Sequence, residues 1–201
     1  VLKKDGTVWA WGWNQYGQSS VPSGLSNVIA IAGGGAHSLA LKSDGTVVAW
    51  GYVYAVNSVP GGLTNVTAIS AGGYHSLALK RDGTVVSWGE CNWGQCNVPA
   101  GLTNVVAVAA GNLHSLALKI DGTVVAWGSN THGESTVPTG FTNVVAISAQ
   151  ASHFQGENAC HFSLALFGTP PAPPSITAQP QSQTVIAGAS VMYSVTAEGA
   201  D

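Results

Sequence analysis

Charged side chains are scarce in this sequence of 201 residues, at 7% of the chain, and the net charge is only −3. The six basic residues lie beside Asp-Gly pairs, about one for each pair, and do not cluster. They are Lys3, Lys4, Lys42, Lys80, Arg81 and Lys119. Nucleic-acid binding needs a clustered basic stripe, so we expect no nucleic-acid partner.

The sequence also lacks helical periodicity and long apolar runs, although 45% of its residues are hydrophobic. No run approaches the roughly 18 apolar residues that a transmembrane helix needs, so we expect no membrane span in this segment. The 26 glycines suit a protein with many tight turns. Together these features predict an all-β protein.

Only three cysteines are present, Cys91, Cys96 and Cys160. Cys91 and Cys96 fall within one loop, close enough to form a disulfide in an oxidising compartment. The alternative is two free thiols at the positions where the first repeat unit has Asn14 and Ser19. The sequence leaves both possibilities open.

What the sequence does contain is a repeat. His75-Ser-Leu-Ala-Leu-Lys-Arg-Asp-Gly-Thr-Val-Val-Ser-Trp-Gly89 recurs at 37–51 and 114–128, with partial copies at 3–12 and 161–166. The Asp-Gly pair returns every 38 or 39 residues, and a fixed period of this size indicates stacked supersecondary units. We place the units near 1–34, 35–72, 73–111 and 112–167.

The sequence pattern of each unit predicts four short antiparallel strands, which would form one blade of a β-propeller. Within 65–99, alternation indicates strands at 65–71 and 75–79, and an Asp-Gly turn leads into a third strand at 84–88. A fourth, edge strand ends at Pro99, because proline cannot donate to a ladder. The repeated tryptophans are predicted to fill the space between blades, and they are Trp11, Trp50, Trp88 and Trp127.

The recurring Val-x-Ala-Ile-x-Ala-Gly-x-x-His-Ser-Leu-Ala-Leu-Lys-x-Asp-Gly-Thr-Val-x-x-Trp-Gly resembles the repeat of the regulator-of-chromosome-condensation family. It is most similar to bacterial secreted members, including the β-lactamase-inhibitory propeller. The resemblance covers residues 1 to about 167 and implies a seven-bladed propeller used for protein recognition. About four blades are present, so we expect part of a larger ring. The alternative is a four-bladed ring closed by pairing 161–166 with 3–11.

A proline-rich linker at 168–175 follows the repeats, and 176–201 resembles the start of a bacterial immunoglobulin-like (Ig-like) domain. A truncated β-sandwich of this length cannot bury a core of its own. Such modules resemble the spacers of large bacterial extracellular proteins. We therefore expect a secreted or cell-surface bacterial protein.

The loops of successive antiparallel strands gather at two ends. The Asp-Gly turns and the Pro-x-Gly-Leu-Thr-Asn connections share one end and hardly differ between units. The loops before His-Ser-Leu-Ala-Leu and after Trp-Gly share the other end and differ strongly, which marks the end free to be specialised. The candidate binding residues at this variable end are Trp13, Tyr16, Tyr52, Tyr54, Tyr74, Trp93, Leu113, His132 and Phe154.

This end also carries Glu90, Glu134 and Glu157 and no Lys or Arg, a composition typical of protein or glycan recognition. In the inhibitory relatives, aromatic residues just before the His of each unit contact the partner. Tyr74 and Leu113 take that place here. The alternative is that these side chains only cap the propeller end.

The last unit carries an insertion at 151–160. It brings His153, Glu157 and Cys160 close to His161 in the sequence, but the spacing matches no standard zinc pattern. His161 more simply takes the repeated His position. We expect a lengthened binding loop, with no metal and no cofactor.

The repeated histidines His37, His75 and His114 occur once per unit, which favours a structural hydrogen bond to the backbone over catalysis. No Ser-His-Asp set, carboxylate pair or phosphate-binding glycine loop stands out, so we predict a protein that is not an enzyme. The leading hypothesis is a protein-recognition propeller. The alternatives are an architectural spacer in a large extracellular protein and a glycan-binding accessory domain.

Overall fold

The computed structural model describes residues 1–52, 58–151, 162–168, 175–178 and 196–198. The chain divides into two compact units, Val1–Phe167 and Gly168–Asp201, and each is considered on its own. The described residues contain strands and turns and no helix.

Antiparallel sheets account for all thirteen strands of the described residues, arranged as β1-β2-β3, β4-β5-β6, β7-β8-β9, β10-β11 and β12-β13. The strands are β1 Val28–Gly33, β2 His37–Lys42, β3 Val47–Gly51, β4 Val66–Ala71, β5 His75–Lys80, β6 Val85–Gly89, β7 Val105–Ala110, β8 His114–Lys119, β9 Val124–Gly128, β10 Val144–Ala149, β11 Ser163–Phe167, β12 Ser175–Ala178 and β13 Thr196–Glu198. We number the first four sheets as blades 1 to 4. The predicted all-β architecture of propeller-like blades is confirmed.

The Asp-Gly turns close the β2–β3 hairpin and its counterparts as the sequence predicts. Asp44 Oδ1 accepts hydrogen bonds from the Thr46 backbone N–H at 3.0 Å and the Thr46 hydroxyl at 2.6 Å. Gly45 has a φ of 79°, a conformation that a residue with a Cβ rarely adopts. The same arrangement at Asp82 and Asp121 explains why this turn is nearly invariant along the chain.

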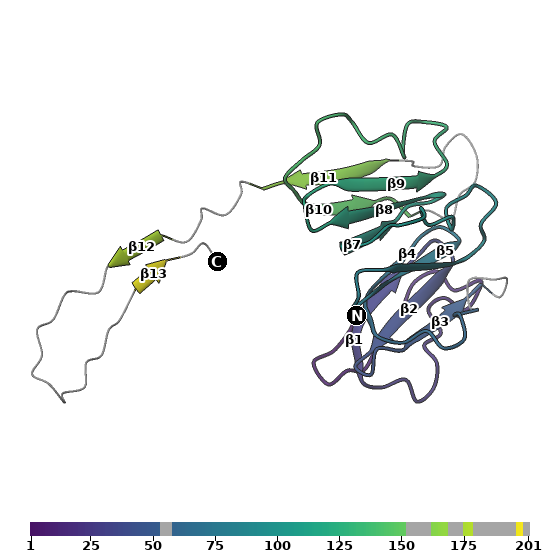
Figure 1. Cartoon of the computed structure of the whole chain (residues 1–201). Helices are drawn as coiled ribbons and strands as arrows, with labels where there is room; N and C mark the ends of the chain where they lie inside the picture. The colour runs from purple at the N-terminus through teal and green to yellow at the C-terminus, as the bar shows by residue number, and fades with distance from the viewer. Residues whose placement is uncertain (53–57, 152–161, 169–174, 179–195, 199–201) are drawn as a thin grey trace, which may run out of the picture. The chain divides into compact units, whose positions relative to one another are not determined.

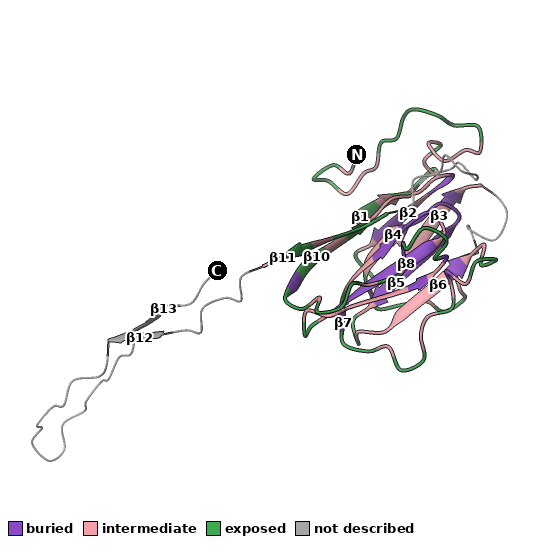
Figure 2. Cartoon of the chain, turned by 90° about the horizontal axis from the view of Figure 1, so that it is seen from above, coloured by how far each residue is buried: buried purple, intermediate pink, exposed green. Residues whose placement is uncertain are grey.

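Neighbouring blades stack on each other, β1 beside β4, β4 beside β7 and β7 beside β10 (Figure 1). The buried band in Figure 2 runs through the central strands, where Leu77 of β5 is fully buried. Trp88 packs against Leu39 and Leu41 of the preceding blade, and Trp127 packs against Leu77. The predicted role of these indoles as filler between blades is therefore confirmed.

Trp11 departs from this pattern. It is 75% exposed, whereas Trp50, Trp88 and Trp127 are 6–7% exposed. The reason is positional, because residues 1–12 precede the first complete sheet and no blade stands before them in the described structure.

Each complete blade pairs three strands, not the four that the sequence predicts. The segment predicted as the fourth strand of the second blade, up to Pro99, is irregular instead and follows a turn at 92–96. Its side chains still pack inward, since Val98 and Leu102 contact the cluster around Trp127. Side-chain packing thus holds this segment without a β-ladder.

The last blade differs from the prediction in register. Ser163 takes the place of Ser76 and Ser115, because it pairs with Ala149 as Ser76 pairs with Ala71. Phe162 therefore occupies the position that His75 has in blade 2, and the expected assignment of His161 to this position is wrong. His161 itself lies outside the described residues.

In the second unit, β12 pairs with β13 through Ile176 and Ala197. The Ig-like assignment stays a prediction. Nothing among the described residues is a helix long and apolar enough to cross a membrane.

Candidate recognition surface

The variable loops meet at one end of the blades, which we call the loop end. It comprises the loops before β2, β5 and β8 and those after Trp11, β3, β6 and β9. Four aromatic rings form a continuous row across it. Trp13 lies edge-on to Tyr16 at 5.3 Å between ring centroids, Tyr16 to Tyr52 at 4.9 Å, and Tyr52 to Tyr74 at 6.0 Å. The two ends of the row, Trp13 and Tyr74, are 61 residues apart in sequence.

The row forms because Ala36 is small. Ala36 precedes His37 just as Tyr74 precedes His75, and it is fully buried. Tyr16 and Tyr52 pack against the pair of Ala36 and Tyr74. The absence of a large side chain at position 36 therefore makes room for rings from two neighbouring loops.

A side-chain clamp fixes the tip of each loop that follows a Trp-Gly pair. Gln18 Oε1 accepts the Tyr16 backbone N–H at 2.9 Å, and Gln95 Oε1 accepts that of Trp93 at 2.9 Å. In the third blade a glutamate does the same, because Glu134 Oε2 accepts the His132 backbone N–H at 2.7 Å. Gln95 and Glu134 are buried, so the tips stand on internal supports.

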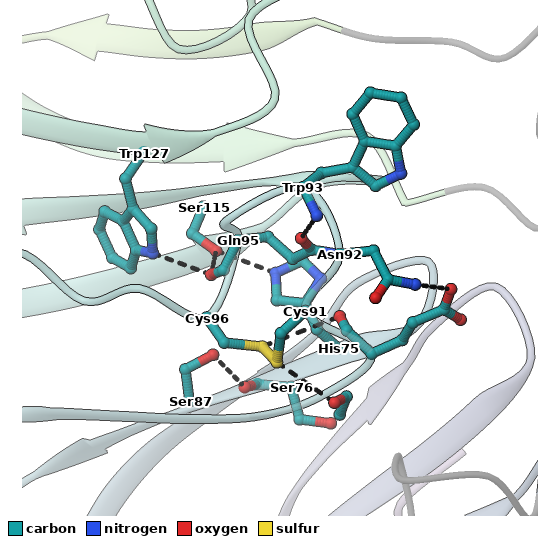
Figure 3. Close-up of a disulfide and its surroundings, with 12 residues drawn as sticks. His75, Ser76, Ser87, Cys91, Asn92, Trp93, Gln95, Cys96, Ser115 and Trp127 are labelled. Carbon is teal, nitrogen blue, oxygen red and sulfur yellow. Dashed lines mark hydrogen bonds between the residues drawn. A yellow bond between two sulfur atoms is a disulfide. The ribbon is translucent and has the colours of Figure 1, made fainter.

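These loops are also attached to the next blade. The Gln95 carbonyl accepts hydrogen bonds from Ser115 Oγ at 2.9 Å and from the Trp127 indole nitrogen at 2.8 Å (Figure 3). The Gln18 carbonyl is held in the same way by Ser38 and Trp50. Each tip is therefore braced by the blade that follows it.

A disulfide links Cys91 and Cys96 across the loop that presents Trp93, with 5.2 Å between the Cα atoms (Figure 3). The structure thus favours the bridge over the two free thiols. In the first unit the same two positions are joined by a hydrogen bond from the Ser19 backbone N–H to Asn14 Oδ1 at 2.8 Å. The covalent bond replaces a hydrogen bond at the same place in the repeat.

The repeated histidines join neighbouring blades. His37 Nε2 lies 2.9 Å from Ser76 Oγ, and His75 Nε2 lies 2.9 Å from Ser115 Oγ. His114 Nε2 lies 3.0 Å from Ser163 Oγ. The predicted structural role is thus supported, but the partner is a serine hydroxyl and not the backbone. Burial holds the His37 and His75 rings neutral, since it lowers the pKa of His37 to about 4 and is the main cause that lowers the pKa of His75 to about 3.

The charges divide between the two ends. At the turn end, Lys42, Lys80 and Lys119 form exposed ion pairs of 3.0–3.2 Å with the Asp of the adjacent turn. Hydrogen bonds from Thr46 lower the pKa of Asp44 to about 2. The pKa values of Asp82 and Asp121 are lowered to about 2 by the threonines of their own turns. At the loop end the described ionisable residues include Glu90 and Glu134 and no Lys or Arg.

The structure separates the predicted binding residues by accessibility. Trp13 and Trp93 are 49% and 52% exposed, and His132 is also exposed. Tyr16, Tyr52 and Leu113 are half-buried. Tyr74 is 8% exposed, so it supports the row and offers little surface to a partner. Tyr54 and Phe154 lie outside the described residues.

The clamp role of Gln18 and Gln95 is not evident from the sequence alone, although Gly-Gln recurs at 17–18 and 94–95. A repeated polar residue that turns out to be buried is a signal for such a support. No group of three or more His, Cys, Asp or Glu side chains with metal-binding geometry occurs among the described residues. The residues His153, Glu157, Cys160 and His161 lie outside them.

The fold defines the class of protein as a β-propeller, and the comparisons agree. The regulator of chromosome condensation (RCC1) repeat matches residues 1–18, 28–52, 66–95 and 105–134, just over half of the chain. The chain therefore belongs to the RCC1 repeat family. No curated protein sequence matches it.

Solved structures show the same fold. Yeast RCC1 (Prp20), crystallised with Kap60, is 22% identical with a TM-score of 0.60, over 74% of this chain and 48% of that one. Prp20p from Saccharomyces cerevisiae, described with its binding to Gsp1p and histones, is 22% identical with a TM-score of 0.56, over 70% and 49%. The ectodomain of the Physcomitrella patens receptor kinase CR4 is 26% identical with a TM-score of 0.58, over 69% and 40%. The chain spans half or less of these proteins' lengths.

Proposed function

We propose that this chain is a non-enzymatic recognition module that binds a partner protein through its loop end. The observation that carries the proposal is Trp93, a half-exposed indole on a loop that a disulfide and the Gln95 clamp hold in place. A large aromatic side chain that is already ordered contributes contact area at little entropic cost on binding. Trp13 supports the same reading at the far end of the aromatic row.

The membership of the family supports this proposal. RCC1 repeat propellers act as protein-interaction modules, and yeast Prp20 is described with Kap60, Gsp1p and histones as partners. We propose a different, secreted or cell-surface setting in a bacterium for this chain. The Cys91–Cys96 disulfide supports it, because such bonds persist mainly in oxidising compartments.

A glycan is a second candidate ligand, favoured by the exposed indole faces of Trp13 and Trp93. The experiment that separates the two is capture of purified extracellular proteins and of an array of glycans by the immobilised chain. We expect Trp93→Ala to weaken capture of a protein partner by about 30-fold, the loss of a hot-spot aromatic residue. Arg81→Ala, an exposed change at the turn end, is the matched control and should leave capture unchanged.

Binding that survives both Trp93→Ala and Trp13→Ala would place the site elsewhere. Capture of glycans alone would replace the protein partner with the second candidate. The absence of any ligand would favour the architectural spacer over both.

A further inference from the structure

The loop after β6 combines two side chains that the repeat does not require, a carboxylate and an exposed indole. Glu90 stands directly after the Trp-Gly pair of this loop, and Trp93 stands at its tip. The corresponding pairs are Trp13 and Tyr16 in the first unit and Ser129 and His132 in the third blade. Among the described loops that follow a Trp-Gly pair, only the loop of 90–96 therefore has a carboxylate and an aromatic ring at these two positions.

The carboxylate of Glu90 is oriented from within the loop. Asn92 Nδ2 donates to Glu90 Oε1 at 2.9 Å, and the Glu90 backbone N–H donates to the Tyr74 carbonyl at 2.9 Å. Burial is the main cause that raises the pKa of Tyr74, and the negative charge of Glu90 is among the other causes. The Glu90 charge is thus held in place close to the aromatic row.

This carboxylate has no cation of its own within the described part of the chain. Lys42, Lys80 and Lys119 pair with the Asp of the adjacent turn at the turn end. Glu90 is half-buried and forms no ion pair with any described residue, and its Oε2 accepts no hydrogen bond from one. A partner that brings a positive charge to this place would therefore complement it.

The indole of Trp93 borders the same surface. Trp93 is 52% exposed and lies within the loop that the Cys91–Cys96 disulfide closes. Figure 3 shows the Trp93 ring and the Asn92 side chain on the same side of the loop, away from the disulfide. Because Asn92 holds the Glu90 carboxylate, the ring and the carboxylate are both presented there.

An arginine side chain matches this pair of groups better than any other. Its guanidinium is planar and permanently charged, so one face stacks on an indole while the N–H groups at the edge donate to a carboxylate. A cation within about 6 Å of the centroid of a tryptophan ring is attracted by the ring quadrupole. Lysine offers a point charge without the flat face, and an apolar side chain would leave the Glu90 charge unpaired.

We propose that the loop of 90–96 binds an arginine side chain of the partner protein, with the guanidinium stacked on the Trp93 indole and hydrogen-bonded to the Glu90 carboxylate. This inference rests on the proposed function and specifies the partner, whose contact surface carries an exposed arginine. Asn92 is a positioning residue, because it occupies Oε1 and leaves Oε2 available to the ligand. No Lys or Arg among the described residues of the loop end repels the incoming cation.

The direct test is a titration of the isotopically labelled 201-residue chain with N-acetylarginine N-methylamide, followed by NMR through the indole N–H signal of Trp93. The signal is assigned by its loss in Trp93→Phe. The citrulline derivative is the control ligand, since citrulline has nearly the shape of arginine without its charge. We expect the arginine derivative to bind at millimolar concentrations and the citrulline derivative to bind at least about 10-fold more weakly.

Glu90→Gln tests the carboxylate separately from the rest of the loop. Glutamine keeps an oxygen that accepts from Asn92 and removes the charge, so the arginine derivative should bind about 5-fold more weakly. Asp121→Asn is the matched control, because it makes the same chemical change at the turn end and keeps an acceptor for Thr123. Binding of the arginine derivative should be unchanged in this variant.

The same variant applies to a protein captured through the loop end. Glu90→Gln should weaken its capture by about 5-fold at low salt and by less at high salt, because salt screens exposed charges. Each exposed arginine of the captured protein is then replaced by glutamine. For one of these arginines, the loss should not add to that of Glu90→Gln, as a double-mutant cycle shows for residues in contact.

Equal binding of the arginine and citrulline derivatives would overturn the proposal, as would arginine binding that is unchanged in Glu90→Gln. A captured protein that is lost in Trp93→Ala but unaffected by Glu90→Gln would leave the recognition function in place and refute the arginine site. Binding of the arginine derivative without capture of any protein would support the arginine site and count against the proposed function alone.

Discussion

Nε2 of His75 donates a hydrogen bond of 2.9 Å to Ser115 Oγ, and this assignment follows from the second bond that the hydroxyl makes. Ser115 Oγ donates its only proton to the Gln95 carbonyl at 2.9 Å, so it can only accept from the histidine. His114 is assigned in the same way, because Ser163 Oγ donates to the Glu134 carbonyl. One serine hydroxyl thus ties two blades and a recognition loop together.

Ser115→Ala should destabilise the protein more than the loss of one hydroxyl group would suggest. The change leaves the buried Nε2–H of His75 without its acceptor, and the penalty for such a group is roughly 1–3 kcal/mol. Ser87→Ala is the matched control, because blades 1 and 3 already have Ala49 and Ala126 at that position. Urea denaturation measures both. Equal free energies of unfolding for the two variants would contradict the proposed importance of the link.

Acid should destabilise the fold through the buried histidines before the carboxylates titrate. The pKa of His37 falls from 6.5 to about 4 and that of His75 to about 3, so the unfolded chain binds protons that the folded chain does not. Stability is therefore complete above pH 6.5 and decreases as the pH falls toward 4. Each ring contributes a slope of roughly 1 kcal/mol per pH unit in that interval.

The variant that checks this pH dependence is His75→Gln, which keeps a donor toward Ser115 and does not titrate. Its free energy of unfolding should depend less steeply on pH between 6 and 4.5 than that of the wild type. The Asp turns contribute only at lower pH, since their pKa values lie at about 2. Parallel curves for the two proteins would show that His75 is not the titrating group.

Two adjacent glycines should respond to alanine in opposite ways. A Cβ at Gly34 would clash with the Gly72 carbonyl oxygen of the next blade, so Gly34→Ala should separate the blades and cost more than about 2 kcal/mol. A Cβ at Gly33 meets nothing within 4 Å, and the later blades have alanine there. Gly33→Ala should be neutral or stabilising by up to about 1 kcal/mol. Thermal melts of the pair provide the comparison.

The disulfide loop should tolerate conversion to the form found in the first unit. Cys91→Ala with Cys96→Ala removes a short loop closure worth about 2 kcal/mol. Cys91→Asn with Cys96→Ser should recover about 1 kcal/mol, because Asn14 and Asn130 hold the same loop through a backbone N–H. Thermal unfolding and quenching of Trp93 fluorescence report on both variants. A melting temperature for the Asn/Ser pair no higher than for the Ala pair would exclude this replacement.

Much of the scaffold was predictable from local sequence. The Asp-Gly turns need only a residue that accepts the Thr46 donors and a glycine with positive φ, so every copy of the motif forms the same hairpin. The alternation in His-Ser-Leu-Ala-Leu places Leu77 and Leu79 on one face, and both are buried. The sorting of loops into a uniform and a variable end follows from strand reversal alone.

The candidate site was only partly predictable. Trp93 and Trp13 were identified because they interrupt a repeat, but sequence could not show that Tyr74 is buried. Its burial depends on Tyr52 and Tyr16, which come from other loops. The fourth strand was predicted from Pro99 and apolar residues before it, yet packing of Val98 satisfies that segment without a ladder.

The sequence by itself determined the period, the strands, the turns and the kind of residue at the loop end, because each depends on neighbours within one repeat. Tertiary structure decided which histidine meets which serine, that Phe162 and not His161 takes the repeated position, and that Trp11 lies in solvent while Trp50 is buried. These outcomes depend on contacts with the neighbouring blade. A side chain between two blades acquires its environment only when both blades are in place.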